Sequence, residues 1–285
     1  MTELLTPRDV TRLLDVHGLA PRKSDGQNFV IDPNTVRRIV AAAELDAGDT
    51  VLEIGPGLGS LTLGLAAHAA QVVAVEIDAG FVAALTEVVG GLDNVTVHHA
   101  DALRADLGVL TDGAPVRLVA NLPYNVATPL LFHALAHPGV QDAFVMVQRE
   151  VGERWCATVG DHAYGAVSLK LALAVESRIT LSIPRSVFHP VPNVDSVMVA
   201  VRRRADAPTG DDLTRLAALA DTAFTQRRKT LRNNLKRLID PAGLDAAGLD
   251  AAAATAGIDL GARAETLDRA ALLRLDTALQ AIAAG

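Results

Sequence analysis

"VLEIGPGLGSLT", Val51–Thr62, decides how the rest of the sequence is interpreted, because an apolar strand leads directly into a glycine-rich turn and a helix. The turn carries Gly55, Gly57 and Gly59, which permit positive φ and let a ligand approach the backbone closely. The turn differs from two known nucleotide-binding loops. The dinucleotide fingerprint G-x-G-x-x-G has glycine where this chain has Ser60, and the Gly-Lys-Ser/Thr of a Walker loop is absent. The turn predicts a ligand site, and the neighbouring strands have to identify the ligand.

Short apolar runs alternate with helix-length segments around this motif. The runs that we predict as buried parallel strands are residues 50–55, 71–77, 94–99, 116–121 and 143–148. Two later runs predict an antiparallel hairpin at the sheet edge, and they are residues 178–183 and 194–201. Helix starts are expected at Thr6-Pro7 and Asp32-Pro33, where a capping residue precedes proline. The alternation predicts an α/β fold with a doubly wound sheet.

The length of 285 residues, half of them hydrophobic, allows one large or two smaller domains with a substantial core. Residues 204–212, RADAPTGDD, have the composition of a linker. Beyond them the chain is rich in Ala and Leu and has no strand-like run. We therefore predict a sheet domain over residues 1–205 and a small all-helical domain over residues 206–285.

Several classes of protein are disfavoured. No apolar run reaches the roughly 18 residues of a membrane span, and the N-terminal residues do not resemble a signal peptide. A single cysteine, Cys156, excludes an internal disulfide and a Cys-based zinc cluster. His133 and His137 have the spacing of a metal pair, but Ala134 stands where a zincin helix has glutamate. We expect a cytoplasmic, monomeric protein that uses neither a metal nor a membrane.

Polar side chains follow the strands after the glycine turn. Glu76 and Asp101 each come at a strand end, and Asn121 ends a further strand in "VANLPYN", residues 119–125. A carboxylate about 20 residues after the glycine loop suits ribose hydroxyls, and a second acid could accept from an adenine amino group. Taken singly, either acid could be a solvated loop residue or a helix cap. Because strand ends of such a sheet converge on one crevice, the ordered series predicts a single site.

The ordered stretches "LEIGPGLGSLT", "VEID", "HADAL" and "NLPY" resemble the motifs of class I S-adenosylmethionine-dependent methyltransferases. Three more stretches, residues 26–32, 187–199 and 224–235, narrow the resemblance to the small-subunit (16S) rRNA adenine N6,N6-dimethyltransferases, the kasugamycin-sensitivity family. The related macrolide-resistance methyltransferases of large-subunit rRNA share the N-terminal motifs, but "QRRKTLRNNL" fits the small-subunit enzymes better. The resemblance covers nearly the whole chain and implies a Rossmann-like class I methyltransferase sheet with a small all-α C-terminal domain.

The resemblance implies S-adenosyl-L-methionine as the cofactor. The residues that it implies for cofactor binding are Gln27, Asn28, Val30, Gly55, Gly57, Glu76, Asp101, Ala102 and Asn121. In this set Glu76 would hold the ribose, and Asp101 with the Ala102 backbone would read the adenine. The family often has Leu where this chain has Val30, and a backbone contact tolerates the change.

The resemblance also implies a second adenine, the substrate, at the "NLPY" turn. The side-chain carbonyl of Asn121 and the backbone carbonyl of Leu122 would each accept an N6 hydrogen, on a turn that Pro123 makes rigid. These contacts would aim the N6 lone pair at the methyl donor. Tyr124 would stack on the flipped base and Phe188 would clamp its other face.

Basic residues are concentrated although the formal net charge is −7. Residues 202–204 and 226–237 are the basic segments, and the second contains Arg228, Arg232 and Lys236 at i, i+4 spacing. The apolar residues beside this ridge predict one continuous helix, and they are Ala220, Phe224, Leu231, Leu235 and Leu238. Because the ridge lacks i, i+4 acidic partners, phosphate contact is favoured over a solvated face.

The predicted RNA-binding residues are Arg227, Arg228, Lys229, Arg232, Lys236 and Arg237. The leading hypothesis is an enzyme that dimethylates N6 of two adjacent adenosines in the 3′-terminal hairpin loop of 16S rRNA during small-subunit assembly. The partner would be 16S rRNA in the small subunit or its precursor. A binding module that acts as an assembly factor is a second hypothesis, and both roles can coexist. An NAD-dependent dehydrogenase is disfavoured by Ser60 and by the absence of a hydride-transfer constellation.

Overall fold

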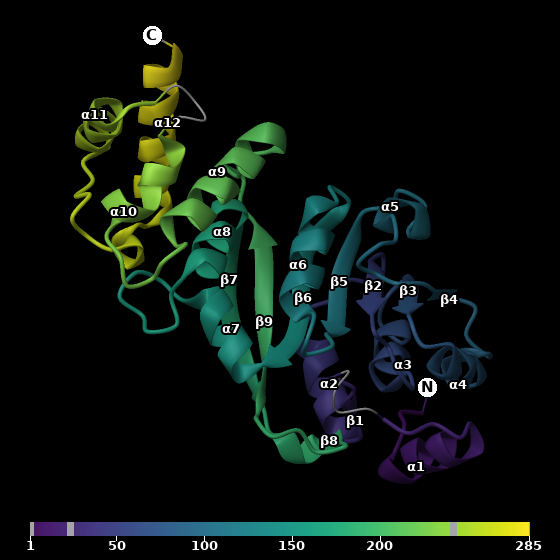
Figure 1. Cartoon of the computed structure of the whole chain (residues 1–285). Helices are drawn as coiled ribbons and strands as arrows, with labels where there is room; N and C mark the ends of the chain where they lie inside the picture. Colours follow the sequence, from purple (N-terminus) through teal and green to yellow (C-terminus); the bar gives the residue numbers. More distant parts are fainter. Residues whose placement is uncertain (1–2, 22–25, 240–243, 285) are drawn as a thin grey trace. The chain divides into compact units, whose positions relative to one another are not determined.

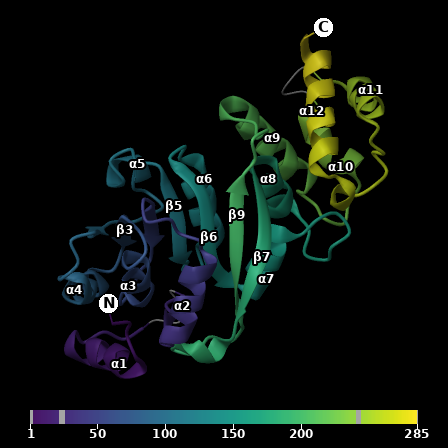
Figure 2. The same cartoon turned by 180° about the vertical axis from the view of Figure 1, so that it is seen from behind.

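The chain divides into two compact units in the computed structural model, which describes residues 3–21, 26–239 and 244–284. The sheet unit consists of Met1–Gly152 and Arg178–Arg202, and the helical unit of Glu153–Ser177 and Arg203–Gly285. Figures 1 and 2 show the elements of both units from opposite sides. The chain passes between the units three times, and the predicted boundary between residues 205 and 206 lies close to the third crossing, at Arg202–Arg203. It assigns residues 153–177 to the sheet domain, whereas their contacts lie in the helical unit.

A mixed sheet confirms the predicted α/β fold. Its strands stand in the order β4-β3-β2-β5-β6-β9-β7, which runs from right to left in Figure 1. Their bounds are β2 (Thr50–Ile54), β3 (Gln71–Glu76), β4 (Val95–His99), β5 (Val116–Asn121), β6 (Val140–Gln148), β7 (Val175–Ile183) and β9 (Ser196–Arg203). The strands β4, β3, β2, β5 and β6 pair in parallel, and β9 pairs antiparallel with β6. The two late runs therefore lie at the sheet edge, as predicted.

Burial follows position in the sheet. β2 and β5 lie inside the sheet, and Leu52 and Leu118, which pair across them, are fully buried. β4 lies at the edge, so its residues are half-exposed, which corrects the prediction of a fully buried strand there. The helix α3 (Ser60–Ala66) packs on β3, and α6 (Ala127–Ala136) packs on β6. The parallel strands therefore end along one edge, where the loops that follow them meet.

The helices of the sheet unit begin where the sequence places capping residues. Thr6 and Asp9 form a reciprocal capping box, and the Asp32 carboxylate accepts from the backbone at the start of the next helix. The helix bounds are α1 (Pro7–Val16), α2 (Pro33–Ala42), α3 (Ser60–Ala66), α4 (Ala79–Val89), α5 (Leu107–Leu110), α6 (Ala127–Ala136) and α7 (Arg149–Cys156), the last of which crosses into the helical unit. Both predicted helix starts are confirmed.

A small second sheet lies beside the main one. β1 (Phe29–Val30) pairs antiparallel with β8 (Phe188–His189), and the short 3-10 helix Arg185–Val187 precedes β8. Residues more than 150 positions apart in the sequence, Val30 and Phe188, are thereby paired. This pairing holds the segment around Asn28 against the ends of the main strands.

The helical unit has its own apolar core, built from Leu and Ala side chains such as Leu231, Leu235 and Leu272. Its elements are α8 (Ala166–Ala174), α9 (Gly210–Ala223), α10 (Leu231–Leu235), α11 (Ala246–Ala256) and α12 (Arg269–Ala284), with 3-10 turns at Lys236–Leu238 and Ala264–Thr266. The buried hydroxyl of Tyr164 donates to the Leu267 carbonyl at 2.5 Å, and burial raises the pKa of Tyr164 to about 12. Across the described residues, no helix combines the length and apolar character needed to cross a membrane.

Candidate active site at the strand ends

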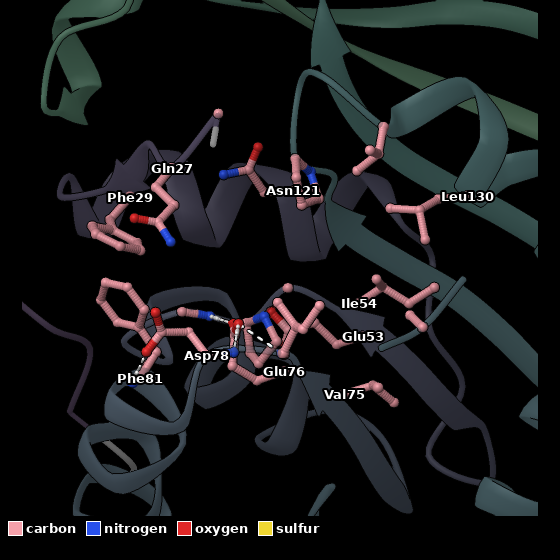
Figure 3. Close-up of a pocket in the computed structure, with 18 of the residues that line it drawn as sticks. Gln27, Phe29, Glu53, Ile54, Val75, Glu76, Asp78, Phe81, Asn121 and Leu130 are labelled. Atoms are coloured by element: carbon pink, nitrogen blue, oxygen red, sulfur yellow. Dashed lines mark hydrogen bonds between the residues drawn. The ribbon is translucent and has the colours of Figure 1, made fainter. Parts of the chain in front are cut away.

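The ends of the parallel strands surround a cavity of about 480 Å³, a size typical of small-ligand sites. Figure 3 shows Phe29 and Phe81 together at one end of it and Leu130 toward the other. The predicted site residues that line it are Gln27, Asn28, Val30, Gly55, Gly57, Glu76, Asp101, Ala102, Asn121 and Pro123. The structure thus brings the whole predicted cofactor set together within the sheet unit, although the role of each residue stays a prediction.

Two glycines after β2 have a conformation that other residues adopt only with strain. Gly55 has φ +70° and Gly57 has φ +57°. A Cβ on Gly57 would overlap the ring of Phe29, and one on Gly55 would lie 3.3 Å from Pro123 Cγ. Side chains at these positions would therefore fill the space between the loop and the facing wall of the cavity.

Glu76, at the end of β3, is held by backbone amides. Its Oε2 accepts from the Gly57 amide at 3.1 Å, and its Oε1 accepts from Ile77 at 2.9 Å and Asp78 at 3.0 Å. Burial raises the pKa of the Glu76 carboxyl, and the amide donors oppose that rise. Oε2 keeps a further lone-pair direction, so the group can still accept from a ligand hydroxyl.

Asp101 and Ala102 follow β4 on the same rim of the cavity. One carboxylate oxygen of Asp101 accepts from the Leu103 amide at 3.0 Å, and the other lies 3.4 Å from Nε of the exposed Arg104. Ala102 is buried. The Asp101 carboxylate is therefore fixed by its own loop while it borders the cavity.

The Asn121 side chain, at the end of β5, is oriented by a contact that the sequence did not predict. Its Nδ2 donates to the backbone carbonyl of Asn28 at 2.8 Å, and Asn28 Nδ2 donates to the Gly26 carbonyl at 3.1 Å. Because the amide nitrogen is engaged, Oδ1 is the remaining polar atom, and it is buried without a hydrogen-bond partner among the described residues. A buried acceptor left without a donor is costly, so the arrangement favours a ligand that brings an N–H.

The residues after Asn121 form the predicted turn. Leu122 is buried and its amide donates to the Met146 carbonyl at 3.1 Å. Pro123 lines the cavity, whereas the half-buried Tyr124 does not. The Tyr124 hydroxyl lies 2.6 Å from Oγ of the fully buried Ser196, and burial raises its pKa. The β9 residue Ser196 thus anchors the ring whose face was predicted to stack on a base.

The predicted clamp at Phe188 is wrong for this structure. Its side chain is 1% exposed and packs in the core of the sheet unit with residues such as Val30 and Met146. The ring therefore has no free face on which a base could stack. Its backbone pairs with Val30 of β1, so Phe188 positions the segment that contacts Asn121.

The comparisons with known proteins agree with this geometry. The model of the family described as ribosomal RNA adenine dimethylase matches residues 18–279. The chain belongs to this family. A relative from Thermobifida fusca, named ribosomal RNA small subunit methyltransferase A, is 49% identical over 278 residues, which cover 95% of this chain and 95% of the relative.

Two solved structures share the fold. The 23S rRNA methyltransferase ErmE is 30% identical, with a TM-score of 0.68, and the match covers 88% of this chain and 99% of that one. A dimethyladenosine transferase from Plasmodium falciparum is 25% identical, with a TM-score of 0.71, and covers 88% and 97%. The chain is therefore a methyltransferase with a class I sheet. This membership excludes the dehydrogenase hypothesis.

Sequence reasoning missed several residues of the dimethylase cavity. Phe29 and Phe81 pack together with ring centroids 5.1 Å apart and both line the cavity. Asp78 also lines it while its carboxylate caps α4. Glu53, the fourth residue of β2, is buried and lines the cavity. The signal for Glu53 was a charged residue inside the apolar run "VLEIG".

The basic segment of the dimethylase differs from its prediction. The continuous helix is wrong, because α9 ends at Ala223 and α10 begins at Leu231. The buried side chain of Asn234 donates hydrogen bonds to the backbone carbonyls of Ala223 and Gln226, which stabilises the turn between the two helices. The five apolar residues that were predicted beside the ridge, Ala220, Phe224, Leu231, Leu235 and Leu238, all lie in or against the core of the helical unit.

The predicted RNA-binding cations are exposed but not equivalent. Arg232 forms an ion pair of 2.6 Å with Asp250 of α11, an acidic partner that is distant in the sequence and lies outside the i, i+4 pattern. Arg227 donates to the His162 carbonyl at 2.8 Å. Among the six predicted cations, Arg228, Lys229, Lys236 and Arg237 have neither an acidic partner nor a side-chain hydrogen bond within the described part of the chain.

The histidine pair also has other contacts. His133 Nε2 lies 3.1 Å from the Ala105 carbonyl, and His137 Nδ1 accepts from the Gly139 amide at 3.1 Å. In residues 3–21, 26–239 and 244–284, no group of three or more His, Cys, Asp or Glu side chains is placed to hold a metal ion.

Proposed function

We propose that this enzyme transfers methyl groups from S-adenosyl-L-methionine to N6 of two adjacent adenosines in the 3′-terminal hairpin loop of 16S rRNA, during small-subunit assembly. Family membership supports adenine dimethylation. The choice of the small subunit is supported by 49% identity to a relative of that name, against 30% to a 23S rRNA methyltransferase. A cytoplasmic location and a monomeric state belong to the same proposal.

The observation that carries the proposal is the orphaned Oδ1 of Asn121. The contact between its Nδ2 and the Asn28 carbonyl leaves a buried acceptor at the cavity wall, beside the rigid Pro123 turn. An exocyclic amino group supplies the donor that this acceptor lacks. A metal or a covalent intermediate is not required for such recognition.

The cavity fits S-adenosyl-L-methionine, which supplies a methyl group on a positively charged sulfur. Glu76 would accept from the ribose hydroxyls while its amide contacts keep the carboxylate in place. Asp101 and the Ala102 backbone would contact the adenine edge, as the order of the strands predicts. The strained glycines leave room for the ligand against the loop.

The chain acts on the target base by orientation. Asn121 Oδ1 and the Leu122 carbonyl would each accept one N6 hydrogen, which directs the nitrogen lone pair out of the ring plane toward the methyl donor. Asn121 stays neutral, so the proton of the methylated amine leaves to solvent. Tyr124, anchored through Ser196, would present its ring to the base.

The proposed RNA contacts lie in the helical unit, at Arg228, Lys229, Lys236 and Arg237, whose charges have no acidic partner in the described residues. Arg227 and Arg232 would join them only by releasing their contacts with His162 and Asp250. These cations would bind phosphates, because exposed cations on flexible side chains are not held in the fixed positions that recognition of a base edge requires.

The test is methyl transfer from labelled S-adenosyl-L-methionine to undermethylated 30S particles, followed by nucleoside analysis. We expect N6,N6-dimethyladenosine at two adjacent positions of 16S rRNA, and methylation slower by about 10²–10³ with Asn121→Ala under the same conditions. Label in 23S rRNA alone, or methylation at a base other than adenine, would contradict the proposal.

A further inference from the structure

A buried carboxyl group under the glycine loop has no role in the mechanism above. Glu53 is the fourth of the five residues of β2 and is 1% exposed. It lines the cavity, where Figure 3 labels it. Its Oε2 is buried with no hydrogen-bond partner among the described residues. An ionised carboxylate in such a place is costly unless a cation or donors reach it.

The surroundings of Glu53 contain no cation that could neutralise it. The neighbouring strand β3 presents Glu76, whose negative charge acts on Glu53. Helix α3 presents the hydroxyls of Ser60 and Thr62, and β5 ends at the neutral Asn121. Further along the cavity wall lie Asp78 and Asp101, and no Lys, Arg or His is among its described lining residues.

These neighbours keep a proton on Glu53. Burial raises the pKa of the Glu53 carboxyl to about 8, and the Glu76 charge adds to the rise. The nearby Thr62 hydroxyl opposes this rise in the pKa of Glu53, although the hydroxyl oxygen has no hydrogen-bond partner at normal distance and angle among the described residues. Glu76 differs because three backbone amides stabilise its anion.

The charge of the wall also distinguishes the two forms of the cofactor. S-adenosyl-L-methionine carries a sulfonium and an ammonium against one carboxylate, whereas the thioether product has lost the sulfonium charge. A cavity wall lined by carboxyl groups favours the ligand with the more positive charge. This preference is largest when the buried Glu53 is ionised.

We propose that Glu53 is a charge-recognition residue that gives up its proton when the cationic cofactor enters the cavity, so that the enzyme prefers the sulfonium over the thioether product. The O–H bond of the carboxyl breaks and the proton passes to the buffer. When the methyl group has been transferred, the positive sulfur is gone and Glu53 takes a proton back. This inference rests on the proposed cofactor but concerns a residue to which the mechanism assigns no step.

The linkage predicts how affinity depends on pH. Below about pH 8 the free enzyme must lose a proton to form the ionised complex, so affinity for S-adenosyl-L-methionine should rise by up to about tenfold per pH unit and flatten above. Affinity for the thioether product should change much less over the same range. The preference for cofactor over product therefore grows with pH.

The experiment is calorimetric titration of the purified enzyme with each ligand, in buffers that differ in ionisation enthalpy. We expect release of nearly one proton at about pH 7 with S-adenosyl-L-methionine and close to none with the product. Glu53→Gln keeps the shape of the side chain and should abolish the difference. The amino groups of the ligands titrate in both proteins, so the difference between wild type and Glu53→Gln isolates Glu53.

A control variant and a ligand-free measurement complete the test. Asp101→Asn removes another carboxylate from the wall and should weaken binding while proton release persists, because Asp101 is paired with Arg104. Without ligand, the native state holds a proton that the unfolded chain loses, so the free energy of unfolding should fall between about pH 4.5 and 8. Glu53→Gln should remove that fall.

The outcomes separate the two proposals. If neither ligand binds the wild-type enzyme, the proposed function fails. If both bind and the wild type releases no more protons than Glu53→Gln, the role of Glu53 is overturned while the proposed function stands. If the variant does not fold, the wild-type titrations alone still show whether binding of S-adenosyl-L-methionine releases or takes up protons.

Discussion

The strand-end cavity and the basic segment of residues 226–237 were both predicted from short motifs, but only the first was found as predicted. In the cavity, residues from separate strands, such as Gly57, Glu76 and Asn121, come together. In the basic segment, neighbours in the sequence are separated by a turn, and Arg232 is paired with Asp250. Order along a parallel sheet therefore predicts proximity better than spacing within a presumed helix does.

The largest expected effect tests the corrected position of Phe188 in the core of the sheet unit. Phe188→Ala should lower the free energy of unfolding by about 3–5 kcal/mol, because a buried ring is lost from the core. Phe188→Leu should cost less than about 1.5 kcal/mol. Denaturant titration measures both. Phe188→Leu should also methylate particles nearly normally, and a stable Phe188→Leu enzyme without turnover would restore the clamp.

The next effect concerns the amide that the cavity orients. Asn121→Ala should reduce single-turnover methylation by about 10²–10³, as expected when one oriented polar group is removed. Particle affinity should persist. Asn125→Ala is the matched control. Asn125 comes from the same turn and also lines the cavity, but it is exposed, so the variant should keep most activity. Equal losses in both variants would show that the turn, and not the Asn121 amide, is decisive.

Glu76 gives a smaller effect on binding alone. Glu76→Ala should weaken S-adenosyl-L-methionine by about 1.5–3 kcal/mol, because charge-assisted hydrogen bonds to the ribose are lost. Calorimetry measures this change. Glu76→Gln retains one acceptor oxygen and should lose less. Unchanged affinity in Glu76→Ala would remove the residue from the ribose role.

The smallest effect tests which cations of the basic segment are available to RNA. Arg228→Ala with Lys236→Ala should flatten the salt dependence of particle binding by about one log unit per lost phosphate contact. Arg232→Ala should change it less, because Arg232 is already paired with Asp250. Binding at several salt concentrations provides the measurement, and cofactor affinity should be unchanged in all variants. Equal slopes for every protein would mean that the RNA contacts lie elsewhere.

Much of the fold could be read from local patterns. The capping residues Thr6 and Asp32 start helices where predicted, and the apolar runs form the strands of the sheet. Phe188 and the break after Ala223 could not be read in this way. The first depends on pairing with a distant segment, and the second on a buried Asn234 that reaches back to the preceding helix.

The sequence by itself determined the sheet, the helical C-terminal region and the row of polar residues at the strand ends. The physical reason is that parallel strands end at one edge, so order along the chain becomes order along the rim. Only the tertiary structure decided which way the Asn121 amide points, that Phe188 is buried and that the Glu53 carboxyl is enclosed in the cavity wall. These properties depend on burial and on contacts between segments far apart in the sequence, and no local pattern encodes either.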